Sequence, residues 1–264
     1  MATKRKRKKS RKRLSPDQWR LLLALFALAL LLGVFIMLDW SRKFDVEVKR
    51  YPQFGIDIPV AYSIHGIDVS RYQQTVLWPE VKAMRVDSLK IGFAFIKATE
   101  GEDDSDEQFK RNWRGARLAR VVRGPYHYFI PSKDARKQAA NFIKSVALAP
   151  GDLPPVLDVE QANNLTPDQI RAGVKIWLQL VEQHYKIRPM LYTNPEFYEK
   201  YLGKDFDGYP LWVAHYFEKR KPKIKRDWLI WQHNNAGRVN GIATAVDFNV
   251  FNGDSAAFRS ILVK

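Results

Sequence analysis

Two acidic residues, Asp158 and Glu160, stand two positions apart at the end of a short apolar stretch, 153–157. Pro154 and Pro155 exclude a helix there, and the branched residues that follow favour extended backbone. Residues two apart in a strand project from the same face, about 6–7 Å apart at Cα, so the two carboxyl groups would share one site. Two acids in one site cannot both ionise freely. A protonated acid beside a carboxylate is the arrangement that cleaves glycosidic bonds.

From residue 63 onward, short apolar stretches alternate with stretches of helical periodicity. The alternation predicts strands at 64–69, 92–98, 124–129, 155–160, 189–193, 211–215, 229–232 and 245–250, and helices at 76–85, 107–119, 134–146, 167–185 and 195–202. The helix at 167–185 is the clearest, because Thr166 can cap it and Pro167 suits its first position. Five strand–helix units followed by three strands predict an α/β fold, an irregular TIM-like barrel.

In such a barrel the chemistry lies at the C-terminal ends of the strands, and polar residues collect at those ends here. Asp68 ends the first strand, and Asp247 reaches the same rim if the last strand runs antiparallel. Acids are costly to bury without a use, so we expect a catalytic group made of Glu160, Asp158, Asp68 and Asp247. The candidate sugar-binding residues at this rim are Tyr128, Tyr192, Trp231, Gln232, Lys97, Glu100, His127 and Tyr216, with Trp212 as a further aromatic.

Each candidate also has a simpler structural explanation. An isolated Asp-x-Glu is usually a helix cap followed by a solvent-facing acid. Lys97 and Glu100 could pair with each other, His127 could be a hydrogen-bonded core histidine, and Trp231 and Trp212 could fill the core. Other chemistries have little support, because the chain has no cysteine and its five histidines lack metal-ligand spacing. We therefore expect neither a metal nor a cofactor.

The N-terminal part differs in composition from the rest. The formal net charge is +16, and ten of the 44 Lys and Arg residues fall in residues 1–20. Residues 21–38 carry no charge and are apolar, and as a helix they would span about 27 Å, with Trp19 and Trp40 near the two ends. We predict a basic cytoplasmic tail (1–20), a transmembrane helix (21–38), a stalk (39–62) and a catalytic barrel (63–264).

The charge asymmetry predicts how the chain lies in the bilayer. The positive-inside rule places the tail in the cytoplasm and the barrel in the periplasm or outside the cell, as a single-pass inner-membrane protein. Orientation and attraction to anionic lipid then explain the basic tail, so we expect no nucleic-acid partner. A cleaved signal peptide is the alternative, but no small-x-small site follows the apolar stretch.

Seven short motifs occur in order between residues 63 and 254. They are His65–Ser70, Phe95–Gly101, Gly124–Phe129, Leu157–Glu160, Leu211–Tyr216, Trp231-Gln232 and Val246–Asn249. Together they resemble glycoside hydrolase family 25, the lysozymes of the Chalaropsis type. The resemblance implies an irregular barrel of five strand–helix units plus three strands, in agreement with the pattern above. It also implies hydrolysis of the β-1,4 bond between N-acetylmuramic acid and N-acetylglucosamine in peptidoglycan.

By that resemblance Glu160 is the acid that protonates the leaving oxygen, and Asp158 is its partner. Asp158 would act as nucleophile or base, or would orient the substrate's own N-acetyl group; we favour the second route. Asp68 and Asp247 would shape the charge and orient the sugar. We expect a monomer that binds peptidoglycan glycan strands and the lipid bilayer. The alternative is an anchored module that holds peptidoglycan without cutting it, although binding alone needs aromatics and amides rather than four acids.

Overall fold

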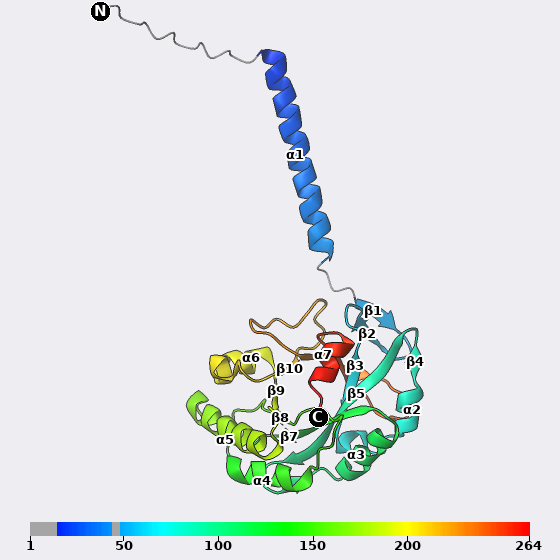
Figure 1. The fold of residues 1–264 in the computed structure, drawn as a ribbon, viewed down its shortest axis with the longest axis vertical. Helices are drawn as coiled ribbons and strands as arrows, with labels where there is room; N and C mark the ends of the chain where they lie inside the picture. Colours follow the sequence, from blue (N-terminus) through cyan, green and yellow to red (C-terminus); the bar gives the residue numbers. More distant parts are fainter. Residues whose placement is uncertain (1–14, 44–47) are drawn as a thin grey trace, which may run out of the picture. The chain divides into compact units, whose positions relative to one another are not determined.

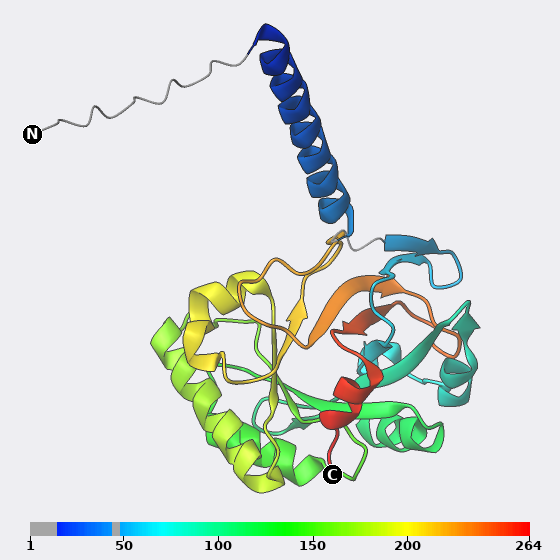
Figure 2. The ribbon, with the colours of Figure 1, turned by 45° about the horizontal axis from the view of Figure 1, so that its top comes forward.

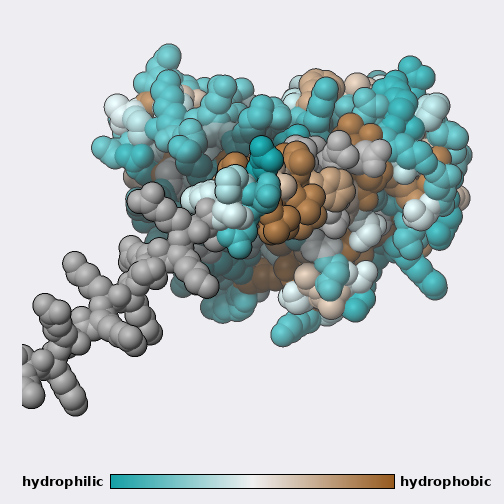
Figure 3. Space-filling view, turned by 90° about the horizontal axis from the view of Figure 1, so that it is seen from above, coloured by the Kyte–Doolittle hydropathy of each residue, from teal (hydrophilic) through white to brown (hydrophobic). Residues whose placement is uncertain are grey.

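The computed structural model describes residues 15–43 and 48–264, and the chain divides into two compact units, 1–45 and 46–264. Most of the predicted basic tail lies outside the described residues. In the first unit, α1 (Pro16–Lys43) contains the predicted transmembrane segment. Residues Pro16–Met37 form a helix long and apolar enough to cross a membrane by length and composition. In the space-filling view of one face, brown apolar side chains gather on this helix, whereas the visible surface of the second unit is mostly hydrophilic (Figure 3).

The second unit is built around a closed barrel of eight strands (Figure 1). The strands are β3 (His65–Val69), β5 (Leu89–Glu100), β7 (Val122–Tyr128), β8 (Val156–Asp158), β9 (Met190–Thr193), β10 (Leu211–Ala214), β11 (Ile230–Gly237) and β12 (Val246–Phe251). The seven barrel strands other than β12 are parallel to one another, and β12 closes the barrel antiparallel to both β11 and β3. The predicted irregular barrel and its antiparallel last strand are confirmed.

Helices follow the first five barrel strands and largely stop after them, as predicted. They are α2 (Trp78–Ala83), α3 (Phe109–Leu118), α4 (Ala135–Ser145), α5 (Pro167–Tyr185) and α6 (Pro195–Phe197), with α7 (Ser255–Ser260) at the C-terminus. Thr166 caps α5 through a reciprocal capping box with Gln169. The predicted helix at 195–202 is broken: α6 passes into a π-helical turn, η2 (Tyr198–Leu202), and a 3₁₀ turn, η3 (Gly203–Phe206). Shorter pieces are η1 (Arg71–Gln73), β4 (Arg85–Val86) and β6 (Asp104–Ser105).

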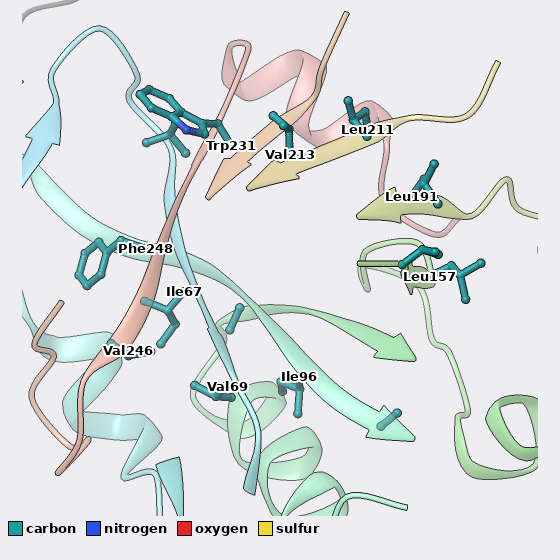
Figure 4. Packing of buried hydrophobic residues seen from close by; sticks show 14 of the residues in the cluster. Ile67, Val69, Ile96, Leu157, Leu191, Leu211, Val213, Trp231, Val246 and Phe248 are labelled. Atoms are coloured by element: carbon teal, nitrogen blue, oxygen red, sulfur yellow. The ribbon is translucent and has the colours of Figure 1, made fainter. Parts of the chain in front are cut away.

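Alternation along each strand separates an outer apolar layer from a polar interior at one end of the barrel. The outward side chains form a continuous core under the helices, and Figure 4 shows ten of them with labels: Ile67, Val69, Ile96, Leu157, Leu191, Leu211, Val213, Trp231, Val246 and Phe248. A second apolar cluster, including Phe93, Phe95, Val156 and Phe251, fills the barrel interior below the site. The acids therefore rest on a packed floor.

Residues 48–59 differ from the stalk predicted for 39–62. They form an antiparallel hairpin, β1 (Val48–Tyr51) and β2 (Ile56–Pro59), that belongs to the second unit. Phe54 is fully buried, with its ring 5.4 Å from that of Phe248. The backbone amide of Arg238 donates to the Phe54 carbonyl at 2.8 Å.

The hairpin lies beside β11 and β12, on the outer face that carries no helix (Figure 2). Hydrophobic side chains on that face need a cover, and the hairpin supplies what a helix supplies elsewhere. The charged residues of 48–59 concealed this role in the sequence, because a two-stranded hairpin that covers a barrel leaves its other face in water.

Phe54→Ala tests whether the hairpin is part of the fold. Truncating a fully buried phenylalanine leaves a cavity, so we expect the free energy of unfolding to fall by about 3–5 kcal/mol. Exposed Leu118→Ala is the matched control and should change it by less than about 0.5 kcal/mol. Denaturant unfolding followed by circular dichroism measures both. Equal stabilities of the two variants would mean that residues 48–59 are a spacer after all.

Candidate active site

A polar cavity of ≈ 250 Å³ opens at the C-terminal ends of the parallel strands. It is lined by residues from all eight barrel strands and from the segments that follow β3, β8 and β10. They are Asp68, Val69, Ser70, Tyr72, Gln73, Lys97, Tyr126, Tyr128, Asp158, Glu160, Tyr192, Trp212, Tyr216, Gln232 and Asp247. All four predicted acids are thus brought to one cavity.

Asp158 is the last residue of β8, and Glu160 follows it on the same face. Asp158 is only 7% exposed, and its Oδ1 atom is buried without a hydrogen-bond partner among the described residues. Burial raises the pKa of Asp158 well above its usual value, and the nearby Glu160 charge adds to this. Glu160 stands more exposed at the mouth. Partial burial raises its pKa too, while a hydrogen bond donated by the Tyr128 hydroxyl opposes the rise.

A second acid pair forms where β12 meets β3. In the antiparallel register Asp247 lies opposite Asp68. Burial raises the pKa of Asp68 to about 6, against the effect of hydrogen bonds from Asn249 and Gln232. Burial, and then the negative charge of Asp68, raise the pKa of Asp247 to about 8. Near neutral pH Asp247 therefore keeps its proton and donates a hydrogen bond to an ionised Asp68.

A hydrogen-bond network holds Asp68 in this state. Its Oδ2 atom accepts from Gln232 Nε2 at 2.8 Å and from Asn249 Nδ2 at 2.7 Å. Gln232 Oε1 in turn accepts from the hydroxyls of Tyr192 and Tyr216, each at 2.8 Å. Trp212 Nε1 donates to Asn249 Oδ1 at 2.8 Å. Each amide is therefore fixed in orientation by a donor, and each directs an N–H at the carboxylate.

The ammonium group of Lys97 provides the positive charge of the cavity. It bonds Glu100 Oε2 at 2.6 Å and lies 4.8 Å from the centre of the Tyr128 ring. Glu100 itself does not line the cavity, so its contact with the site runs through Lys97. Lys97 and Glu100 therefore pair with each other, as the simpler explanation has it, and Lys97 also lines the site.

A family model for glycosyl hydrolases family 25 matches residues 67–242. The chain belongs to glycosyl hydrolase family 25.

Relatives of this family 25 glycoside hydrolase agree with the assignment. It is 46% identical over 200 residues to the uncharacterized protein YegX of Escherichia coli K12, covering 76% of this chain and 74% of YegX. It is 32% identical over 218 residues to lysozyme M1 of Streptomyces globisporus, covering 75% and 71%. Its fold is similar to that of a family 25 glycosyl hydrolase from Bacillus anthracis, with a TM-score of 0.72, 29% identity and coverage of 81% and 100%.

Besides Glu100, two more predicted sugar-binding residues of the family 25 enzyme, His127 and Trp231, lie outside the cavity. His127 projects outward between the inward Tyr126 and Tyr128, where it bonds Thr99 and Gln138 and stacks on Trp177 at 5.5 Å. Burial lowers the pKa of His127 to about 3, so it is a neutral core residue.

Trp231 also points outward from the barrel. It is fully buried next to the inward Gln232, and its Nε1 donates to the His215 carbonyl at 2.8 Å. Strand alternation excludes both side chains from the interior.

Several residues that line the cavity or bond its acids were absent from the predicted site. Tyr126 and Asn249 lie two positions from Tyr128 and Asp247, so their inward direction could have been inferred from alternation. Trp212 was predicted as a rim aromatic that could instead fill the core, and it does both, because its ring stacks on Phe95 at 4.3 Å and also lines the cavity. Tyr72 comes from η1, after β3, and no periodic signal marks it.

Asp247→Asn tests the shared proton. Because the folded pKa of Asp247 lies above its ordinary 3.8, the folded enzyme loses stability as pH rises from about 4 to about 8. Asparagine keeps a donor toward Asp68 but cannot ionise. We expect the variant to gain more than about 1 kcal/mol of unfolding free energy over wild type between pH 4 and pH 8, since each pKa unit corresponds to about 1.4 kcal/mol. Urea unfolding at both pH values measures it.

Exposed Asp103→Asn is the control and should leave the pH dependence unchanged. If Asp247→Asn follows the wild-type pH dependence as well, Asp247 is not a buried, proton-holding group.

Proposed function

We propose that this glycoside hydrolase is a peptidoglycan hydrolase that cleaves the β-1,4 bond between N-acetylmuramic acid and N-acetylglucosamine. The observation that carries the proposal is the pair Asp158 and Glu160, with raised pKa values, at the C-terminal end of β8 in the acid-lined cavity. The name of the Streptomyces relative, lysozyme M1, supports the substrate. The tyrosine rings and Trp212 in the cavity wall suit the apolar faces of sugar rings.

Glu160 is the general acid in this proposal. Its raised pKa keeps a proton on a carboxyl group that stands at the cavity mouth, where the leaving oxygen can reach it. Once the proton has been transferred, the Tyr128 hydroxyl and the positive charge of Lys97 stabilise the resulting carboxylate. Glu160 then accepts a proton from the attacking water and returns to its starting state.

Asp158 orients the substrate's N-acetyl group. Among the described residues its buried Oδ1 atom has no partner, so it can accept a hydrogen bond from the acetamido N–H. A positioned acetamido oxygen can attack the anomeric carbon, as in substrate-assisted glycosidases. The desolvation cost of the free Asp158 carboxyl falls when the substrate supplies this donor and a developing positive charge.

Asp68 and Asp247 place a single negative charge at the far wall of the cavity. Together they hold one proton, so the wall contributes one charge rather than two. That charge stabilises a positively charged oxocarbenium-like centre. The fixed amides of Gln232 and Asn249 hold the Asp68 carboxylate in its position. A non-catalytic binding module would gain nothing from four carboxyls gathered in one cavity, because the desolvation of Asp68 and Asp158 is costly.

We also propose that α1 spans the inner membrane as a retained anchor, with the barrel on the periplasmic or extracellular side. Support comes from its length and apolar composition and from the basic residues that precede it. An anchored hydrolase would act on the wall nearest its own membrane.

Glu160→Gln tests the acid. The amide keeps the shape of the side chain but cannot give up a proton, so kcat should fall by about 10²–10⁴-fold or more with the fold intact. The wild-type rate should fall on the alkaline side of its pH profile. The midpoint of that fall should lie above pH 4.5, the ordinary pKa of a glutamic acid side chain. The measurement is kcat/KM against pH on soluble glycan fragments, with mass spectrometry of the new reducing ends.

Exposed Glu107→Gln is the matched control and should retain full activity. Near-normal turnover by a well-folded Glu160→Gln would remove Glu160 from the mechanism and favour the binding module. Cleavage that leaves N-acetylglucosamine at the reducing end would instead overturn the proposed bond.

A reporter fused after Lys264 tests the topology. If α1 is a retained anchor with its basic end in the cytoplasm, alkaline phosphatase at this position should be active, because that enzyme folds only outside the cytoplasm. A cytoplasmic fluorescent reporter at the same position should stay dark. The reverse pattern would contradict the orientation and the access to peptidoglycan, and reporter activity in the culture medium would indicate a cleaved signal peptide.

A further inference from the structure

Residues 217–225, here called the basic loop, connect β10 to β11 where a helix would stand in a regular barrel. The loop carries five Lys or Arg residues and one acid. It begins directly after Tyr216, which lines the catalytic cavity. Together with Glu199 it lines a separate hollow of ≈ 770 Å³.

The loop is held in place at several points along its length. The Phe217 amide donates to the His233 carbonyl at 3.0 Å, and the Lys223 amide donates to His215 Nδ1 at 3.0 Å. Pro222 between them is buried. A ligand that binds this loop therefore has little conformational entropy to overcome.

Part of the positive charge is already neutralised within the protein. Lys223 pairs with Glu218 at 2.8 Å, and Lys225 approaches Glu199 at 3.9 Å. Lys219 and Lys221 are exposed, and the described part of the chain offers neither of them an ion-pair partner. These two lysines leave a local positive charge for an external anion.

Phe217 adds an unusual backbone and an exposed ring. Its φ of +58° lies in the left-handed region, which is unfavourable for a bulky residue, and its side chain is 69% exposed. Strain of this kind persists at functional sites. The Phe217 ring centre is 6.2 Å from that of Tyr216, so the aromatic lining of the cavity continues outward to the loop.

We propose that the basic loop binds the acidic peptides that peptidoglycan carries on its muramic acid, while Phe217 supports the glycan strand where it leaves the cavity. The proposal rests on the proposed function, whose substrate it makes more specific. Peptide carboxylates match Lys219 and Lys221 in charge. The continuity of aromatic rings from the cavity favours the enzyme's own substrate over an anionic membrane surface, which the same charges could attract.

The test compares full-length wild type in detergent with Lys219→Glu/Lys221→Glu on two substrates. These are glycan strands with their peptides and strands stripped of peptides by an amidase. We expect KM to rise about three- to tenfold on the peptide-bearing strands with kcat unchanged, and to stay constant on stripped strands. The wild-type KM on peptide-bearing strands should rise with salt more steeply than that of the variant.

Lys110→Glu/Arg114→Glu on α3 is the matched charge control and should behave as wild type. An equal KM rise on both substrates, or none on either, overturns the proposal.

Binding to intact sacculi separates this inference from the proposed bond cleavage. Glu160→Gln, with and without the loop substitutions, is sedimented with sacculi and with stripped glycan. Loop-dependent sedimentation only with peptide-bearing sacculi supports the inference even if wild type cleaves nothing. Loop-dependent binding to anionic phospholipid vesicles, with sacculus binding unchanged, overturns it in favour of a membrane surface.

Phe217→Gly supplies a second readout. Glycine relieves the left-handed strain, so the melting temperature should be maintained or raised while KM rises on both glycan substrates. Lys186→Gly, at the C-terminus of α5 with the same φ of +58°, is the control and should affect stability alone. An unchanged KM in Phe217→Gly removes the ring from the substrate path.

Discussion

The antiparallel pairing of β12 with β3 is the constraint on which the site depends. It closes the barrel, and in the same register it sets Asp247 against Asp68. Two carboxyls so close can hold only one negative charge at neutral pH, and the amides of Gln232 and Asn249 determine which of the two ionises. A slip of β12 by one residue would turn Asp247 into the apolar outer layer, away from Asp68. The strand pairing that closes the barrel therefore also sets the charge state of the cavity.

The other acid pair depends on a simpler rule. Asp158 and Glu160 share a face because they are two residues apart, and the apolar residues before them hold β8 in the barrel wall between β7 and β9. Their different exposure follows from position: Asp158 ends the strand inside the cavity, while Glu160 stands beyond it. The proposed mechanism uses this difference to give two chemically similar groups two separate tasks, an inner orienting carboxyl and an outer acid.

Much of this architecture could be predicted from the sequence, because strands that lie in a closed barrel have strong, short apolar signals. The positions of the four acids followed from their places at strand ends. The errors have physical reasons. His127 and Trp231 stand next to cavity residues in their strands, but alternation turns them outward, and the prediction weighed residue type above direction. The hairpin at 48–59 was missed because its outer face is charged, and nothing local in the sequence reveals that Phe54 meets Phe248, nearly 200 positions away.

The hairpin also has a mechanical consequence. Val48 and Pro59 are paired at its open end, so the incoming chain and the outgoing chain leave side by side. A load applied to the chain before Val48 acts on one pair of strand residues at a time, in the peeling direction, rather than on the whole ladder in shear. The hairpin is thus the first part of the second unit to yield under tension. As it opens, the outer faces of β11 and β12, which carry Gln232 and Asp247 on their inner side, lose their support. Tension applied to the chain before Val48 would in this way be linked to the geometry of the acids.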